Sequence, residues 1–362
     1  MIAYVFLFTL LFLLSYFEKT SIQFGIGEYV FNGKAVYGIL VFTILSLFMG
    51  LRAESVGCDL VQYHYRYEYV ADIIQGGGIL MNEWGFNYLT YFFHDILNLP
   101  FQFFVFFLSV ITSFCVVFVL FRYSEDFLTS LIIFLTLGSF TMAMSGIRQY
   151  LAVSLLLISI IYCEKKKFIP FIFLCILAYS VHNSSLIFII SYFIYGVRLS
   201  KKNSFILLSI VLGTFAFKNL LGQIIMFITP QRYSGMDIFT TYNINFLILA
   251  VPISMLLFSL FFLDYDQENK MSKKNSFFYL FSCLSLVMLI LSMNNNQLGR
   301  LSYYFNIGTA IVVSSALVNQ KRNDYKSASI VKALISILCL AYFFISTPGG
   351  TLKIDNYTLF FL

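Results

Sequence analysis

The sequence predicts an all-α integral membrane protein with about 12 transmembrane helices and one further re-entrant or interfacial helix. Two observations lead to this fold class. Of the 362 residues, 60% are apolar and 11% are charged, against roughly 45–50% and about 25% in a typical soluble domain. The apolar runs are continuous and do not alternate, which is typical of membrane helices. This composition excludes a soluble enzyme, a disordered chain and a secreted disulfide scaffold.

The predicted spans follow one another along the whole chain. Each needs about 20 apolar residues to cross the hydrocarbon core. We expect them at 2–17, 35–51, 101–121, 127–144, 146–162, 168–181, 183–197, 204–221, 244–263, 277–293, 300–318 and 328–346. Because no soluble domain or long linker separates them, we expect a single transmembrane helical domain over 1–362.

Two polar stretches interrupt this series. Residues 52–83 form the longest polar loop. The segment 84–97 that follows is aromatic, but it carries Asn87, His94 and Asp95, so we expect an interfacial or re-entrant helix there instead of a full span. A second polar loop is expected at 222–243.

The basic residues predict the orientation of the chain in the membrane. Lysine clusters such as Lys165–Lys167 and Lys270–Lys274 are expected on the cytoplasmic side. Counting spans from these clusters places both termini and both polar loops outside. The outer side then holds most of the arginines and all three histidines, namely Arg52, Arg66, Arg148, Arg232, Arg300, His64, His94 and His182. Since the planar guanidinium fork suits phosphate, we expect the chemistry at this outer face.

The first candidate group lies in the outer loop 52–83. It consists of Arg52, Asp59, Tyr63 and Arg66, which share one face if the segment is helical. Gly57 interrupts such a helix, so the phase between Arg52 and Asp59 is open. An amphipathic helix on the membrane surface, with its tyrosines as an interfacial belt, is the alternative interpretation.

Arg148 and His182 are candidates inside or beside predicted spans. An arginine close to hydrocarbon is costly and usually faces a cavity, although a side chain reaching the lipid headgroups is the alternative for Arg148. His182 lies among small polar residues, Ser180, Asn183, Ser184 and Ser185. Histidine titrates near neutrality and can take a proton from a hydroxyl group. A purely structural histidine is the alternative.

A third candidate group opens the predicted span 300–318. Asn296, Arg300, Tyr303 and Tyr304 have the spacing of one helix face. A helix-end anchor with an aromatic belt is the alternative here. Arg232 in the loop 222–243 is a further candidate. No metal-binding motif is present and the six cysteines have no paired spacing, so we predict neither a metal site nor a disulfide framework.

Together these residues resemble a known family. The ordered set comprises Arg52-x4-Gly57-x-Asp59-x3-Tyr63, Glu83-x-Gly85-Phe86, Gly146-Ile147-Arg148-Gln149, His182-Asn183-Ser184-Ser185 and Arg300-x2-Tyr303-Tyr304. In this order, over most of the chain, it is similar to the EpsG-like group of Wzy-type polysaccharide polymerases. Cys58 departs from the small or hydroxyl residue that related sequences often carry.

The resemblance implies a metal-independent glycosyltransferase of the bacterial inner membrane, with a fold similar to the GT-C type. Such an enzyme makes O-antigen, capsule or exopolysaccharide at the periplasmic or outer face. It transfers a growing glycan from polyprenyl (undecaprenyl) diphosphate to a lipid-linked repeat unit. The implied partners are this lipid-linked oligosaccharide, the lipid bilayer and a chain-length regulator of the same pathway. Neither a cofactor nor nucleic acid is expected.

The candidate residues fit such a reaction. We expect Arg148 and Arg300 to hold the diphosphate, assisted by Arg52 and Arg232. His182 is the first candidate for the base, and Asp59 and Glu83 are its rivals. The remaining binding candidates are Tyr63, Asn183, Tyr303 and Tyr304, of which the tyrosines would stack on sugars or donate to phosphate. A flippase or other transporter of lipid-linked oligosaccharide and an O-antigen ligase remain alternative functions.

Overall fold

The computed structural model describes residues 1–19, 24–26, 29–76, 83–228, 246–293, 296–350 and 352–361. These residues form two compact units. Unit 1 contains Met1–Tyr123, Phe140–Tyr192 and Thr347–Leu362, and unit 2 contains Ser124–Ser139 and Phe193–Ser346. The chain passes repeatedly between the two units. No linker of distinct composition marks these passages in the sequence, and for that reason the sequence predicts one domain.

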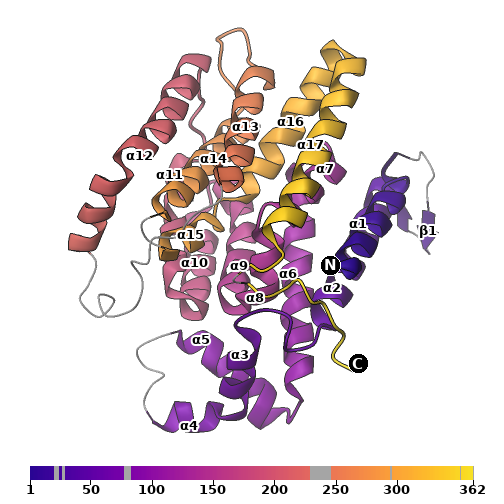
Figure 1. Cartoon of the computed structure of the whole chain (residues 1–362), viewed down its shortest axis with the longest axis vertical. Coiled ribbons are helices and arrows are strands. Elements are labelled where there is room, and N and C mark those ends of the chain that lie inside the picture. The colour runs from indigo at the N-terminus through magenta and orange to yellow at the C-terminus, as the bar shows by residue number, and fades with distance from the viewer. Residues whose placement is uncertain are drawn as a thin grey trace. The chain divides into compact units, whose positions relative to one another are not determined.

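Unit 1 is helical apart from one short antiparallel strand pair, in which Phe24 pairs with Phe31 (Figure 1). Its elements are α1 (Ile2–Leu14), η1 (Phe17–Lys19), β1 (Phe24–Ile26), β2 (Tyr29–Phe31), α2 (Gly33–Gly50), α3 (Leu60–Glu68), α4 (Val70–Gln75), α5 (Trp84–Tyr91), η2 (Phe92–Ile96), α6 (Phe101–Tyr123), α8 (Ser139–Ser145), α9 (Ile147–Glu164), α10 (Phe168–Val181) and η3 (Asn183–Ile189).

Four helices form the framework of unit 1. Helix α2 packs on α6, α6 packs on α9, and α9 packs on α10. Asn32 caps the start of α2, where its side chain accepts the backbone N–H of Ala35 at 2.9 Å. The turn between α9 and α10 contains Lys166 in the left-handed backbone region (φ +53°). Such a tight turn makes α9 and α10 a helical hairpin whose open end carries Arg148 and His182.

The C-terminal segment closes this framework. It pairs with the loop after α2 through backbone bonds from Ala53 to Thr358 (2.9 Å) and from Gly57 to Lys353 (2.9 Å). The amino group of Met1 donates to the carbonyl of Asp355 at 2.6 Å. The two chain ends therefore lie together in unit 1, and the C-terminal segment fixes the loop that leads to α3.

Unit 2 contains most of the remaining helices. They are α7 (Phe127–Thr136), α12 (Lys201–Ile228), α13 (Phe246–Phe262), α14 (Lys273–Leu291), α15 (Asn296–Ser302), α16 (Ile307–Asn323) and α17 (Tyr325–Ser346), while the short helix α11 (Ile190–Ile194) crosses the division. Helix α16 packs on α7, α13, α14 and α17, and its apolar side chains are buried. Asp126 and Ser272 cap the first turns of α7 and α14.

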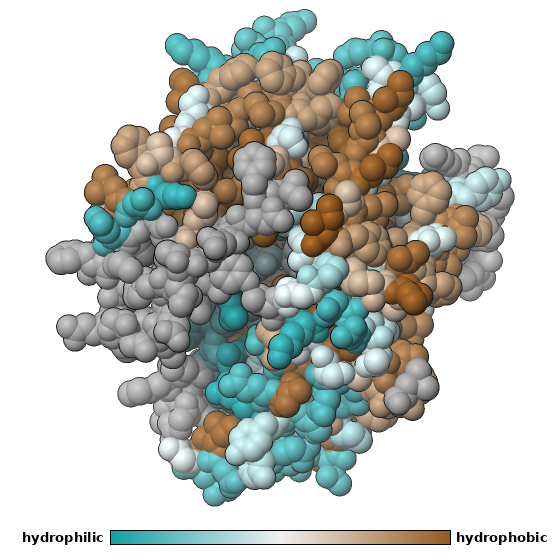
Figure 2. Space-filling view, in the orientation of Figure 1, coloured by the Kyte–Doolittle hydropathy of each residue, from teal (hydrophilic) through white to brown (hydrophobic). Residues whose placement is uncertain are grey.

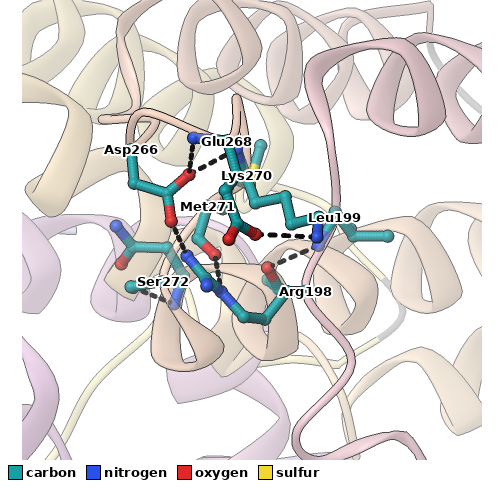
Figure 3. A network of polar contacts seen from close by, with 9 residues as sticks. Arg198, Leu199, Asp266, Glu268, Lys270, Met271 and Ser272 are labelled. Atoms are coloured by element: carbon teal, nitrogen blue, oxygen red, sulfur yellow. Dashed lines mark hydrogen bonds and ion pairs between the residues drawn. The ribbon is translucent and has the colours of Figure 1, made fainter.

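A polar network ties two connections of unit 2 to each other (Figure 3). The guanidinium group of Arg198 pairs with Asp266, and its Nε donates to the carbonyl of Met271 at 3.2 Å. The other carboxylate oxygen of Asp266 accepts the backbone N–H groups of Glu268 (3.0 Å) and Lys270 (2.9 Å). This carboxylate therefore shapes the turn between α13 and α14 and anchors it to the segment before α12.

The structure supports a multi-pass membrane protein, with fewer full-length spans than the twelve predicted. Six described helices are long and apolar enough to cross a membrane, or seven if α7 and α8 count as one broken span. The helices at 2–14, 168–181, 183–194 and 248–262 are apolar but shorter. The predicted span 300–318 is interrupted, since α15 ends at Ser302 and α16 begins at Ile307. Polar residues such as Asn306 break the apolar run there.

The two predicted loops contain more helix than expected. Residues 52–83 include α3 and α4, and 84–97, where a helix was predicted, forms α5 and one π-helical turn. Helix α12 continues to Ile228, because the apolar run 224–228 extends its pattern, and the rest of the loop 222–243 lies outside the described residues. Figure 2 shows hydrophilic residues over the α3–α5 segment, whereas α12 and α17 expose large apolar side chains.

Candidate active site

Three candidate side chains from distant parts of the sequence meet in unit 1. The Glu83 carboxylate pairs with Arg148 Nη1 at 2.5 Å through one oxygen and with His182 Nδ1 through the other. The backbone N–H of Asn183 also donates to this carboxylate. The side chains of Glu83, Arg148 and His182 are 11%, 20% and 20% exposed. The group is therefore largely shielded from water, and part of each side chain stays exposed.

The charge of this cluster is set by its own contacts. Burial by itself raises the pKa of the Glu83 carboxyl group. The hydrogen bond from His182 and the positive charge of Arg148 outweigh burial, so the pKa of Glu83 lies below its ordinary value. Glu83 is therefore a carboxylate at neutral pH. Its bond to Nδ1 keeps the proton of a neutral imidazole on that nitrogen and leaves Nε2 of His182 as a proton acceptor.

A close helix contact brings Glu83 to His182. Glu83 precedes α5 and has a left-handed backbone (φ +60°). The third residue of this segment, Gly85, lies against the last turn of α10. A Cβ atom at Gly85 would lie 2.2 Å from the hydroxyl of Ser180 and 2.7 Å from its Cβ. Only glycine permits this close approach. The approach places Glu83 beside His182, which directly follows the last residue of α10.

Arg148 rests on two aromatic rings. Its guanidinium carbon lies 5.7 Å from the ring centre of Tyr63 on α3 and 5.9 Å from that of Phe86 on α5. These two rings are themselves 5.9 Å apart. Cation–π contact with both rings holds the planar group in place. Nε of Arg148 is buried and has no hydrogen-bond partner among the described residues.

Arg52 lies in the loop after α2 and not on a helix with Asp59 and Tyr63, because α3 begins only at Leu60. Its side chain is completely buried. It donates to the carbonyl of Met49 and, at 2.9 Å, to that of Met144. Burial lowers the pKa of this guanidinium group to about 10. Arg52 therefore stabilises the backbone next to the start of α9.

Asp59 and Cys58 lie on the same side of this loop. Gly57 (φ +116°) leaves no room for a side chain, since a Cβ atom would be 2.7 Å from the carbonyl of Met144. The next residue, Cys58, contacts the Ser145 hydroxyl at 3.0 Å and the Asp59 carboxylate at 3.2 Å. Asp59 is partly exposed and precedes α3.

The other predicted site residues belong to unit 2 or lie outside the residues that the structure describes. Arg300 is exposed on α15. The helix ends at Ser302, so Tyr303 and Tyr304 lie in the turn that follows and do not continue the face of Arg300. Tyr304 is buried, and the Tyr303 ring packs against Gly138. Arg232 lies outside the described residues.

The two other histidines form a separate and more exposed group. His64 pairs with Glu54 at 2.5 Å and His94 with Asp95 at 3.1 Å, and both face Glu68. Among the described residues, no group of three or more His, Cys, Asp or Glu side chains is arranged to hold a metal ion. The metal independence of the reaction stays a prediction from the sequence.

Comparison with known proteins identifies the family. The model of the EpsG family matches residues 35–359, nearly the whole chain. The chain belongs to the EpsG family. This is a Wzy-like, polymerase-type family, so the resemblance seen in the sequence is confirmed. No curated protein and no solved structure matches the chain. The matched region of this EpsG-family protein includes Glu83, Arg148 and His182.

Sequence reasoning gave no role to two residues that build this site. Gly85 and Phe86 are part of the Glu83-x-Gly85-Phe86 motif, but only the structure shows that one permits the helix contact and the other supports Arg148. The sequence feature that could have indicated the helix contact is a glycine two residues after a carboxylate, at the start of an aromatic helix. No sequence feature indicated the contact between the Asn183 backbone N–H and Glu83.

Proposed function

We propose that this EpsG-family protein is a polysaccharide polymerase that transfers a growing glycan from polyprenyl diphosphate to a lipid-linked repeat unit. The observation that carries the proposal is the pairing of the Glu83 carboxylate with His182 Nδ1, next to Arg148. A carboxylate–imidazole pair beside a guanidinium group supplies a base and an anion ligand in one place. We infer that this site faces the periplasm or exterior.

In the proposed reaction, the acceptor sugar hydroxyl attacks the anomeric carbon of the growing glycan. Nε2 of His182 accepts the hydroxyl proton, and Glu83 orients the imidazole and stabilises its positive charge. The bond between the anomeric carbon and the diphosphate oxygen breaks. Polyprenyl diphosphate leaves with the electron pair, and Arg148 stabilises its negative charge.

The remaining candidates have supporting roles in this proposal. The roles of Arg300 and Arg232 as second ligands of the diphosphate stay predictions from the sequence, as do those of Tyr303 and Tyr304 as contacts for sugar or phosphate. Tyr63 positions Arg148 through its ring. Asp59 is the alternative base. For Arg52, complete burial and bonds to two carbonyl groups favour a positioning role over direct contact with the diphosphate.

One assay tests this proposal against its alternatives. The full-length protein, purified in detergent, is incubated with lipid-linked oligosaccharides extracted from cells that lack it, and the glycans are separated on a gel. A ladder of lengths is expected. A single product attached to lipid A indicates a ligase. Movement of labelled lipid-linked sugar across liposomes without lengthening indicates a transporter, and either result overturns the polymerase.

A further inference from the structure

Glu83 is bonded to the same guanidinium group that the proposed function assigns to the diphosphate. This carboxylate lies 2.5 Å from Nη1 of Arg148. A bidentate grip on a phosphate group uses two adjacent N–H donors of the fork. With the carboxylate in place, the guanidinium group can present only part of its fork to an incoming anion.

We propose that Glu83 is a placeholder: its carboxylate neutralises Arg148 in the empty enzyme and is displaced by the diphosphate group of the substrate. This inference rests on the proposed function and adds an exchange of partners to it. The ligand class is an organic or inorganic diphosphate. The exchange breaks no covalent bond.

Glu83 can leave Arg148 without becoming an unpartnered buried charge. Among the described residues it has three partners, and only one of them is Arg148. The bonds from His182 Nδ1 and from the backbone N–H of Asn183 remain when Arg148 turns to another anion. Removing all partners from a buried charge costs several kcal/mol, but removing one of three costs much less.

Arg148 has unused donor capacity in the empty site. Its Nε is buried and has no hydrogen-bond partner among the described residues. A buried donor without a partner is rare, and an oxygen of the diphosphate would supply the acceptor that Nε lacks. The rings of Tyr63 and Phe86 hold the guanidinium plane while its anionic partner changes.

The exchange also links binding to catalysis. While Arg148 pairs with Glu83, the carboxylate shares its charge between a guanidinium group and an imidazole. When the diphosphate takes Arg148, the carboxylate keeps only its bonds from His182 and from the backbone N–H of Asn183, and more of its negative charge is available to stabilise the imidazolium that forms in the reaction. Proton abstraction from the acceptor is then favoured only after the donor has bound.

The chain carries its own reporter for this exchange. Trp84 is the only tryptophan, and it directly follows Glu83. Its side chain is exposed, so its fluorescence responds to changes at the start of α5. The experiment is a fluorescence titration of the full-length, detergent-solubilised protein with inorganic pyrophosphate and, in a second arm, with farnesyl diphosphate.

Removing the placeholder should tighten binding. Glu83→Gln is expected to bind the diphosphate probes about tenfold more tightly than the wild type, while Arg148→Ala binds neither. His182→Ala leaves the Glu83–Arg148 pair but removes one of the partners that Glu83 keeps after the exchange, so it should bind the probes no more tightly than the wild type. If Glu83→Gln does not fold, Glu83→Asp, with a shorter reach toward Arg148, is expected to give a smaller increase.

The matched control is Glu164→Gln, which frees Arg122 from a similar pair at 2.9 Å. Glu164 lies at the opposite end of α9, about 24 Å from Arg148 along the helix. An equal gain in this control would indicate a bulk charge effect and overturn the inference. Unchanged or weaker binding by Glu83→Gln would also overturn it, as would equal tightening toward phosphatidylglycerol micelles.

The two probes distinguish the source of the ligand. A gain for both probes assigns recognition to the diphosphate group alone, and a gain only for farnesyl diphosphate assigns it to a lipid-linked diphosphate. The titration requires no polymer synthesis. A wild type that forms a ladder while Glu83→Gln binds no tighter overturns the placeholder alone, whereas a missing ladder overturns the proposed function.

Discussion

Two arginine–carboxylate pairs in this protein have the same chemistry and different surroundings. Arg148 and Glu83 are 20% and 11% exposed, and their shared partner, His182, comes from a third segment. Arg198 and Asp266 are 34% and 39% exposed, and Asp266 also binds two backbone N–H groups of its own turn (Figure 3). The first pair is assembled by helix packing, and the second is part of a local turn.

The two carboxyl groups also differ in how their pKa values are lowered. At Asp266 the largest cause is the backbone N–H of Lys270, followed by Arg198. At Glu83 burial opposes ionisation, and His182 and Arg148 must outweigh it. A buried pair of this kind brings little net stability, although removing one partner is costly because the other charge is then left buried and unpaired. We infer that the first pair is maintained for chemistry and the second for folding.

The largest expected effect comes from removing Arg148. Arg148→Ala should lower polymer formation by about 10³-fold, because the leaving diphosphate loses its guanidinium ligand. Arg198→Ala is the matched control and should stay within about threefold of the wild type. Gel analysis of the glycan ladder measures both. Near-normal ladders from Arg148→Ala and from Arg300→Ala would rule out the proposed diphosphate clamp.

Replacing His182 should have the next largest effect. His182→Ala is expected to lower transfer by about 10²-fold. It should also abolish the loss of activity at acid pH, since no imidazole is left to be protonated. His64→Ala, in the exposed histidine group, should keep the wild-type pH profile. An unchanged profile in His182→Ala would move the base to a carboxylate such as Asp59.

The helix contact beneath the first pair can be tested without touching a charged group. Gly85→Ala should lower transfer by about tenfold or more, because its methyl group would meet Ser180 and move Glu83 away from His182. Adding Ser180→Gly removes the clashing side chain and should restore part of the activity. A double variant no more active than Gly85→Ala would contradict this positioning role.

The smallest expected effect concerns stability at low pH. Because folding lowers the pKa of Glu83, its ionised form stabilises the protein at any pH above its ordinary value of 4.5. This contribution is lost as the pH falls through the lowered pKa. Thermal unfolding of Glu83→Gln should show about 1–3 kcal/mol less stability at neutral pH and a smaller acid dependence than the wild type.

Asp266→Asn should leave transfer unchanged. A loss of transfer like that of Arg148→Ala would end the distinction between the two pairs.

The sequence by itself determined the class of the protein, the place of most helices and the candidate residues. Long apolar runs fix helices locally, because a backbone in lipid must satisfy its own hydrogen bonds. The motifs containing Glu83, Arg148 and His182 were visible for the same local reason, since polar groups in such a chain are conspicuous. The interruption of 300–318 by a turn was not predicted, because a polar residue such as Asn306 is also compatible with a continuous membrane helix whose polar side chain faces other helices.

Only the tertiary structure decided which candidates act together. It separates Arg52 from the face of Tyr63, buries it and gives its donors to carbonyl groups. It pairs Glu83 with His182, across 99 positions of sequence, through the contact of Gly85 with Ser180. Such pairs depend on the distance between helices that are remote in the chain, and neither hydrophobic periodicity nor residue spacing contains that distance.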